Sequence, residues 1–346
     1  MKRNAALRFA AGLALWTLAS CLSAPAPMPE WYQNMEAVYP RERYIASQGR
    51  GSARAEAEQQ ALAGLAAYFE QEVKREGTAS VSMTERQGAV ERTRRIEEAI
   101  TVTVKRNLSA VRYAEDAWRH PATKEYIVVA YMDREEAWAV YSPHAENAAG
   151  TFTQLFYGAR NEGADPFTRA LLFGKAEAYA AGEAFVTARG FAQGLYPARA
   201  KALFEEADAA LSALPKEASD ARRNASVYLE CPLDLDGIIR NAAIAALSDA
   251  GFPIAREIRS AQAVCLIQVT EGLMRRPAGT GTAYRPNVSV GITSRTGTSV
   301  FSFEAQAEVQ SAIDPGLARS RAYAALAQVF RDALTERLLK GEKGNA

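Results

Sequence analysis

The chain has few of the side chains that usually carry out catalysis or hold metal ions. Its 346 residues include three cysteines and two histidines, His120 and His144. No His or Cys cluster has metal-site spacing, and both the phosphate-binding motif Gly-x-x-x-x-Gly-Lys-Ser/Thr and the nucleophile motif Gly-x-Ser-x-Gly are missing. His120 precedes a proline in an expected hairpin turn and His144 follows Ser-Pro at an expected helix start, so both should be solvated. We predict no enzymatic activity, no cofactor and no metal ion; an active site of Asp, Glu, Lys and Tyr is the alternative.

One cysteine stands where covalent modification is expected. Three basic residues in the first eight positions and an apolar run from Phe9 to Leu18 have the order of a secretory signal. The segment Leu18-Ala19-Ser20-Cys21 resembles the lipobox of bacterial lipoproteins, in which diacylglycerol is attached to the cysteine thiol and the signal is cut before it. The resemblance implies that residues 1–20 are removed and that lipid on Cys21 holds the chain to a membrane. A plain secreted protein and an N-terminal membrane anchor are the alternatives.

The residues after Cys21 predict a stalk. Prolines 25, 27 and 29 favour extended backbone, so residues 21–30 should lift the folded part away from the lipid. Under the enterobacterial sorting rule, an Asp directly after the lipidated cysteine retains a lipoprotein at the inner membrane. Position 22 is Leu, and this favours the outer membrane. Without the three basic residues of the signal, 38 basic residues stand against 40 acidic ones, which excludes electrostatic attraction to nucleic acid.

Residues 31–141 predict a first α+β domain. The expected elements are a strand at 43–48, a helix from Ala53 to Gly77 with Ser52 as N-cap, a strand at 78–85, a helix at 90–104, and a hairpin of 108–118 with 124–134. Gly49-Arg50-Gly51 joins the first strand to the first helix. Because Arg54 stands where a dinucleotide-binding motif needs a third glycine, we interpret this junction as a tight turn that needs backbone freedom.

The motifs of this region resemble a known family. They are Pro29-Glu30-Trp31, Tyr39-Pro40, Tyr44, Gly49-x-Gly51-Ser52, Trp118, the Tyr126–Ala130 strand, Met132-Asp133 and the helix start Arg134–Ala137. Together they resemble the LPP-twenty-like bacterial lipoprotein domain over about 110 residues, 29–141. The fold is similar to the N-terminal domain of a flagellar assembly outer-membrane protein. The resemblance implies a β-α-β fold and an envelope setting, but no chemistry, since the family includes surface antigens and flagellum-associated proteins.

The rest of the chain predicts helices and then a second α+β domain. Residues 142–214 are rich in Ala and should form two or three antiparallel helices, with Pro166 and Pro197 in first turns. Polar residues 215–224 are expected as a linker. Residues 225–340 should form the second domain, with a strand at 226–231, a helix to 250, strands near 252–258, 262–273, 286–294 and 298–311, and a last helix after Asp314. The arginine-rich segment 275–286 is expected as a long loop, either functional or without function.

Two cysteines of the second domain could form a disulfide. Cys231 closes its first strand and Cys265 lies near the start of its third. In a ferredoxin-like arrangement these strands are antiparallel neighbours, and an exported protein meets a compartment that permits disulfides. The alternative is that both are small buried core residues.

The sequence therefore predicts the α+β class: two small α+β modules joined by a helical middle segment, after a signal peptide and a Pro-rich lipid-anchored stalk. We interpret the protein as a non-enzymatic envelope lipoprotein that acts as a structural, assembly or protein-binding module. A narrower version is an accessory of flagellar or other envelope machinery. Its partners would be the membrane, through the lipid on Cys21, and other envelope proteins, not nucleic acid. The alternative is a periplasmic ligand-binding or hydrolytic lipoprotein with a cleft between the modules.

Overall fold

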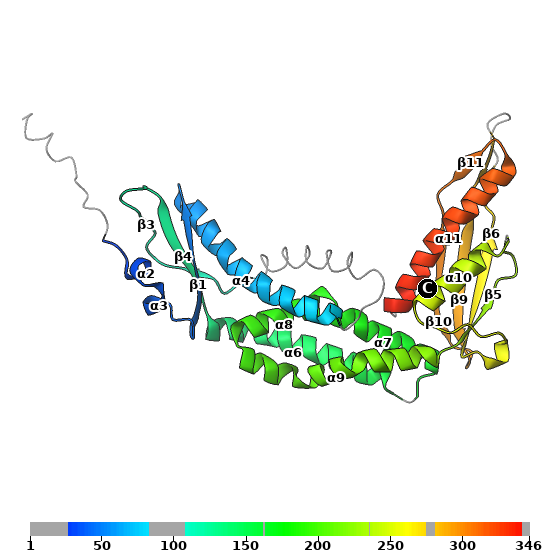
Figure 1. Cartoon of the computed structure of the whole chain (residues 1–346), viewed down its shortest axis with the longest axis horizontal. Coiled ribbons are helices and arrows are strands. Elements are labelled where there is room, and N and C mark those ends of the chain that lie inside the picture. Colours follow the sequence, from blue (N-terminus) through cyan, green and yellow to red (C-terminus); the bar gives the residue numbers. More distant parts are fainter. Residues whose placement is uncertain (1–26, 83–107, 162, 235, 275–280, 341–346) are drawn as a thin grey trace, which may run out of the picture. The chain divides into compact units, whose positions relative to one another are not determined.

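The computed structural model describes residues 27–82, 108–161, 163–234, 236–274 and 281–340, and Figure 1 shows their α+β architecture. The described residues fall into two compact units. Unit one comprises residues up to Tyr68 together with Leu108–Ala137, and unit two comprises the others. The signal peptide, Cys21, most of the stalk and the helix expected at 90–104 lie outside the described residues. Within the described ranges, no helix is long and apolar enough to cross a membrane.

Unit one is built on an antiparallel sheet. Strand β1 (Tyr44–Gly51) pairs along its whole length with β4 (Tyr126–Asp133), and β4 also pairs with β2 (Arg112–Tyr113) and β3 (Trp118–Arg119). The expected first strand and the second arm of the expected hairpin are confirmed, but in its first arm, expected at 108–118, only the short strands β2 and β3 pair with β4. One core gathers Trp31, Trp118, Ile127 and Val129 beneath the short helices α2 (Glu30–Gln33) and α3 (Met35–Val38).

Helix α4 (Arg54–Ser82) packs so closely on β1 that two strand positions admit no side chain. A Cβ atom on Gly49 would lie 2.1 Å from the Ala57 carbonyl oxygen, and one on Gly51 would lie 2.7 Å from the Ala57 nitrogen. Neither glycine has a positive φ. The expectation that the glycines supply backbone freedom is therefore wrong, because what they supply is space for the helix.

The ends of α4 also differ from expectation. Ser52 is not the N-cap: its hydroxyl and its N–H donate to Glu56 Oε2 at 2.7 and 2.8 Å, and the helix begins two residues later. Gly77 does not end the helix, and residues 78–82, expected as a strand, continue it. A glycine costs a helix only about 1 kcal/mol relative to alanine, and buried packing at Gly77 outweighs that cost. Residues 83–85 of the expected strand lie outside the described residues.

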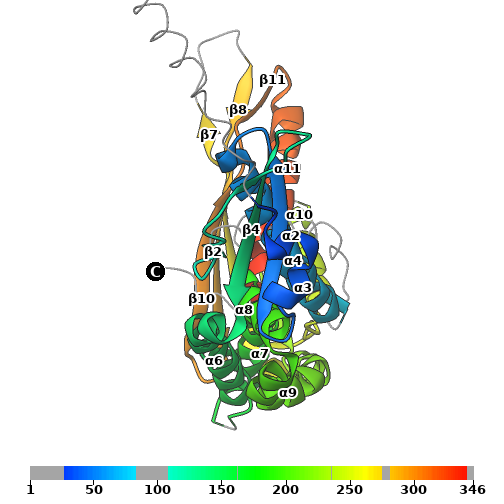
Figure 2. The ribbon, with the colours of Figure 1, turned by 90° about the vertical axis from the view of Figure 1, so that its left-hand side faces the viewer.

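Unit two contains a helical bundle of α6 (Arg134–Ala159, its first turn belonging to unit one), α7 (Pro166–Ala180), α8 (Glu183–Leu195) and α9 (Pro197–Arg223). Helices α7 and α8 follow one another along the bundle, and both pack on the longer α9 (Figures 1 and 2). The two prolines expected in first turns are confirmed there, at α7 and α9. The helices enclose the buried rings of Phe152, Phe156, Phe167, Phe173, Phe185 and Phe204.

The end of α4 belongs to this bundle. A Cβ atom on Gly190 of α8 would lie 2.6 Å from the Val73 Cα atom, so the two helices meet backbone to backbone. Beside this contact, Arg189 Nε lies 2.7 Å from Glu76 Oε2, and Arg189 Nη1 lies 2.9 Å from Asp208 Oδ1. Arg189 thus joins α4, α8 and α9.

The expected linker at 215–224 is wrong, because α9 continues through Pro215 to Arg223. The composition of this stretch is polar, but Ala218, Ala221 and Arg222 point into the core and are buried. A buried face at helical spacing decides the structure here, not the average polarity.

The C-terminal part of unit two is a four-stranded sheet with the order β10-β9-β6-β5. The strands are β5 (Val227–Glu230), β6 (Ala263–Thr270), β9 (Asn287–Ser294) and β10 (Ser299–Gln306). Helices α10 (Ile238–Asp249) and α11 (Pro315–Lys340) share one continuous core with the inner face of this sheet and with α6–α9. A Cβ atom on Gly174 of α7 would lie 2.9 Å from the Leu339 carbonyl oxygen, so the helical segment and the C-terminal sheet domain are not separately packed.

Two expected features of this region are corrected. Residues 252–258 form no strand: Ile254 makes one isolated bridge to Val227, and a 3-10 helix η1 (Ile258–Ser260) follows. The expected loop 275–286 contains strand β8 (Thr282–Tyr284), which pairs with β7 (Leu273–Met274) and β11 (Gln310–Ala312) in a small second sheet. Pairing with two neighbours outweighs the glycine-rich composition of this segment, and residues 275–280 lie outside the described part.

Candidate functional site

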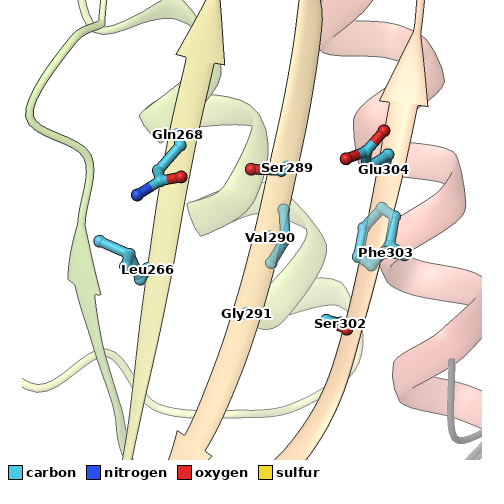
Figure 3. A pocket seen from close by; sticks show the side chains of 8 residues that line it. All are labelled: Leu266, Gln268, Ser289, Val290, Gly291, Ser302, Phe303 and Glu304. Carbon is cyan, nitrogen blue, oxygen red and sulfur yellow. The ribbon is translucent and has the colours of Figure 1, made fainter. Parts of the chain in front are cut away.

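The outer face of the four-stranded sheet is the candidate site. Residues of β6, of β9 and, from Phe301 onward, of β10 alternate between buried and accessible, so every second side chain points away from α10 and α11. The strand register places these accessible residues in rows across the sheet. One row contains Gln268, Ser289 and Glu304; the adjacent row contains Leu266, Gly291 and Ser302 (Figure 3).

A groove of about 580 Å³ lies over these two rows. Gly291, on the middle one of the three lining strands, has no side chain to fill the space between Leu266 and Ser302 on the neighbouring strands. Gln268, Ser289 and Glu304 border the groove on the next row. Val290 and Phe303 also line it, but their side chains are buried on the inner face.

The outer face is negatively charged. None of the four strands contains Lys or Arg, whereas Glu230 and Glu304 both point outward. Glu230 lies in the same row as Leu266 and Gly291, because it pairs with Leu266 across the parallel β5–β6 ladder. The face therefore offers hydrogen-bonding amide and hydroxyl groups and two carboxylates.

The groove contains no arrangement for nucleophilic catalysis, since its two serines have no histidine or lysine beside them among the lining residues. Across the described ranges, no group of three or more His, Cys, Asp and Glu side chains could hold a metal ion. The arrangement is suited to binding by hydrogen bonds and charge.

The structure places the expected cysteine site away from this groove. Cys21 lies outside the described residues. Cys265 points into the core from β6, and Cys231 follows the end of β5; both are free thiols. Burial raises the pKa of Cys265 to about 12 and that of Cys231 to about 11.

The geometry that favoured a disulfide is wrong. Strands β5 and β6 pair in parallel, with Leu229 opposite Cys265, and not antiparallel as a ferredoxin-like order requires. The helix α10 crosses over between the two strands, which makes the parallel pairing possible.

Only one of the two histidines is as exposed as expected: His144 is exposed, whereas His120 is half-buried, with its ring 5.2 Å from that of Trp118 and 6.2 Å from that of Tyr32. In the turn after β3, His120 Nδ1 accepts hydrogen bonds from the N–H groups of Ala122 and Thr123 at 3.3 and 3.2 Å. His144 is exposed, but it stands inside α6 and not at its start, because the helix begins at Arg134 and continues through Pro143.

Sequence reasoning missed the groove, although β9 carries a signal for it. Val288, Val290 and Ile292 form the apolar half of its alternation, while a glycine stands at position 291 in the polar half. An outward glycine in the middle of a strand indicates a place where something approaches the sheet closely.

No protein-family model and no curated protein matches this chain. Among solved structures, a minor lipoprotein from Acinetobacter baumannii is similar over 34% of this chain and 93% of its own, at 14% identity and a TM-score of 0.26. A protein from Xanthomonas campestris is similar over 34% and 86%, at 15% identity and a TM-score of 0.27. A secreted protein from Helicobacter pylori is similar over 86% and 98%, at 13% identity and a TM-score of 0.36. Similarities this distant assign no function.

Proposed function

We propose that this protein is a lipid-anchored component of a bacterial envelope that binds other proteins and has no catalytic activity. The observation that carries the proposal is the outer face of the β10-β9-β6-β5 sheet, which is accessible and grooved and presents hydrogen-bonding groups. Its lining residues form no nucleophile–base pair. A surface of this kind is suited to recognition.

The envelope setting rests on the sequence before the described residues. A lipobox ending in Cys21 and a proline-rich segment after it are the features of an anchored protein, and two or more acyl chains make anchoring effectively permanent. Leu22 favours the outer membrane. The narrower role, an accessory of flagellar or other envelope machinery, rests on the family resemblance of residues 29–141.

Anchoring is tested by Cys21→Ala in cells fed a labelled fatty acid. We expect the variant to lose the label and to leave the membrane fraction, while the matched control Cys231→Ala keeps both. Continued labelling of Cys21→Ala would show that the anchor is assigned wrongly.

Protein binding is tested by a photo-crosslinking amino acid placed at Ser302, in the groove, in living cells. Gly150 of α6 is the control position, because it is exposed and a side chain there would meet nothing within 4 Å. We expect a discrete crosslinked protein from position 302 and none from position 150. The absence of a crosslink at 302, with the protein folded and anchored, would contradict the proposal.

A further inference from the structure

We propose that the groove over Gly291 binds an extended peptide segment that carries a Lys or Arg side chain. This inference rests on the proposed protein-binding function and names the site and the chemistry of the partner.

The fold itself does not require a glycine at position 291. Gly291 has no positive φ, and a Cβ atom built there would meet nothing within 4 Å. By contrast, a Cβ atom on Gly49 would collide with the backbone of α4, and one on Gly190 with Val73. A glycine inside a strand weakens the strand. Its presence where no neighbouring residue needs the space therefore indicates a binding partner that approaches the strand backbone closely.

The charge of the outer face favours a cationic partner. Glu304 borders the groove and Glu230 lies in the same row as Gly291, and in the described part of the chain neither carboxylate takes part in a hydrogen bond or an ion pair. With no Lys or Arg on any of the four strands, the face attracts a cation. A guanidinium or ammonium group beside Glu304 would form a charge-assisted hydrogen bond, which is stronger than a neutral one.

Among cationic partners, the polar side chains of the groove favour a peptide. Gln268, Ser289 and Ser302 can donate to and accept from the amides of an extended backbone that lies over Gly291. The outer face has one aromatic ring, Tyr228 on the edge strand β5, which leaves no platform for stacking over the groove. Its one exposed large apolar side chain is Leu266, too little for insertion into a lipid surface.

The probe is a displayed library of random twelve-residue peptides, selected on the chain from position 21 onward with Cys21→Ala, which carries neither the apolar signal segment nor an attached lipid. We expect the selected peptides to be enriched in Lys or Arg. Their affinity, measured by fluorescence anisotropy with a labelled selected peptide, should fall at least tenfold in Gly291→Tyr, which fills the groove. Glu304→Gln should lower the affinity about tenfold and reduce its dependence on salt. The matched control Gly150→Tyr adds the same ring at an equally open position and should bind like the parent chain.

Three results would overturn the inference: no peptide selected, selected peptides without basic residues, or basic peptides that bind Gly291→Tyr and Glu304→Gln as well as the parent. Far-UV circular dichroism checks that each variant is folded. If Gly291→Tyr does not fold, the peptide affinity of Glu304→Gln alone tests the inference. If the peptide experiment fails while position 302 still crosslinks to a protein, the proposed protein-binding function stands without a basic peptide as ligand. If position 302 gives no crosslink, the proposed function itself fails, so the two failures are distinguishable.

Discussion

The buried ion pair between Arg222 and Glu177 allows a sharp stability prediction for unit two. Arg222 is 1% exposed at the end of α9, and its guanidinium donates to both carboxylate oxygens of Glu177 on α7. The Glu177 side chain is 17% exposed. The Arg222 Nε atom is buried and has no hydrogen-bond partner among the described residues.

Glu177→Ala would leave a guanidinium in the core without its counter-charge. Removing one partner of a buried pair costs about 3–5 kcal/mol, because the remaining charge keeps its desolvation penalty and loses its compensation. The free energy of unfolding of a native protein is typically about 5–15 kcal/mol, so this cost is a large part of the stability of unit two. Replacing both residues, with Arg222→Met and Glu177→Met, removes charge and penalty together and should be neutral or stabilising by about 1–4 kcal/mol.

Urea unfolding followed by far-UV circular dichroism measures these differences. The matched control is Arg223→Met: this neighbouring arginine is 71% exposed and pairs with Asp220 one turn earlier, so its loss should change little. A cost of less than about 1 kcal/mol for Glu177→Ala, or a double variant as unstable as the single one, would show that Arg222 does not depend on Glu177 for its charge compensation.

Three further predictions concern packing, pH and thiol chemistry. Gly190→Ala should destabilise by about 1–3 kcal/mol by forcing α4 from α8, whereas Gly158→Ala, with open space around it, should stabilise α6 by about 0.5–1 kcal/mol in the same urea assay. Burial raises the pKa of Asp133, but hydrogen bonds from Arg43 and from the N–H groups of Glu136 and Glu135 outweigh this and leave the pKa below its ordinary value. The carboxylate therefore stabilises the fold fully above the pKa of an unfolded-chain Asp, and the stability deficit of Asp133→Asn, measured by unfolding across pH, should vanish as pH falls through the lowered pKa. Because their raised pKa values keep them protonated, Cys231 and Cys265 should resist alkylation by iodoacetamide at pH 8 in the folded protein. After unfolding without reductant, mass spectrometry should show that these two cysteines take up two labels. No label on the unfolded chain would indicate a disulfide.

Alternating and helical patterns predicted the elements that have one buried face. Residues 286–294 alternate cleanly and form β9, and the prolines at 166 and 197 begin the helices that they were expected to begin. These local patterns suffice because each element buries one face and the periodicity records which face it is.

Elements decided by distant contacts could not be predicted in this way. Residues 215–224 are polar on average, which predicts a linker. The charge of the buried Arg222 is compensated by Glu177, which lies 45 residues earlier in the sequence, and no local pattern reveals that contact. The pairing of β5 with β6 depends on where α10 returns the chain, which no local pattern specifies. The groove depends on three strands meeting in register, so its signal in one strand was a single glycine.

Anchoring and a shallow groove suit each other physically. A ligand that binds to a few polar side chains and one carboxylate gains little free energy per contact. Each new hydrogen bond replaces hydrogen bonds that the ligand and the groove made with water. If lipid on Cys21 holds the protein as proposed, it would meet a partner of the same envelope at an effective concentration that can reach the millimolar range, so weak binding would be enough. It follows that crosslinking at Ser302 in intact cells should capture the partner, while the chain carrying Cys21→Ala should capture it far less. Equal crosslinking by the anchored and unanchored forms would show that the groove binds tightly by itself and that the anchor serves another purpose.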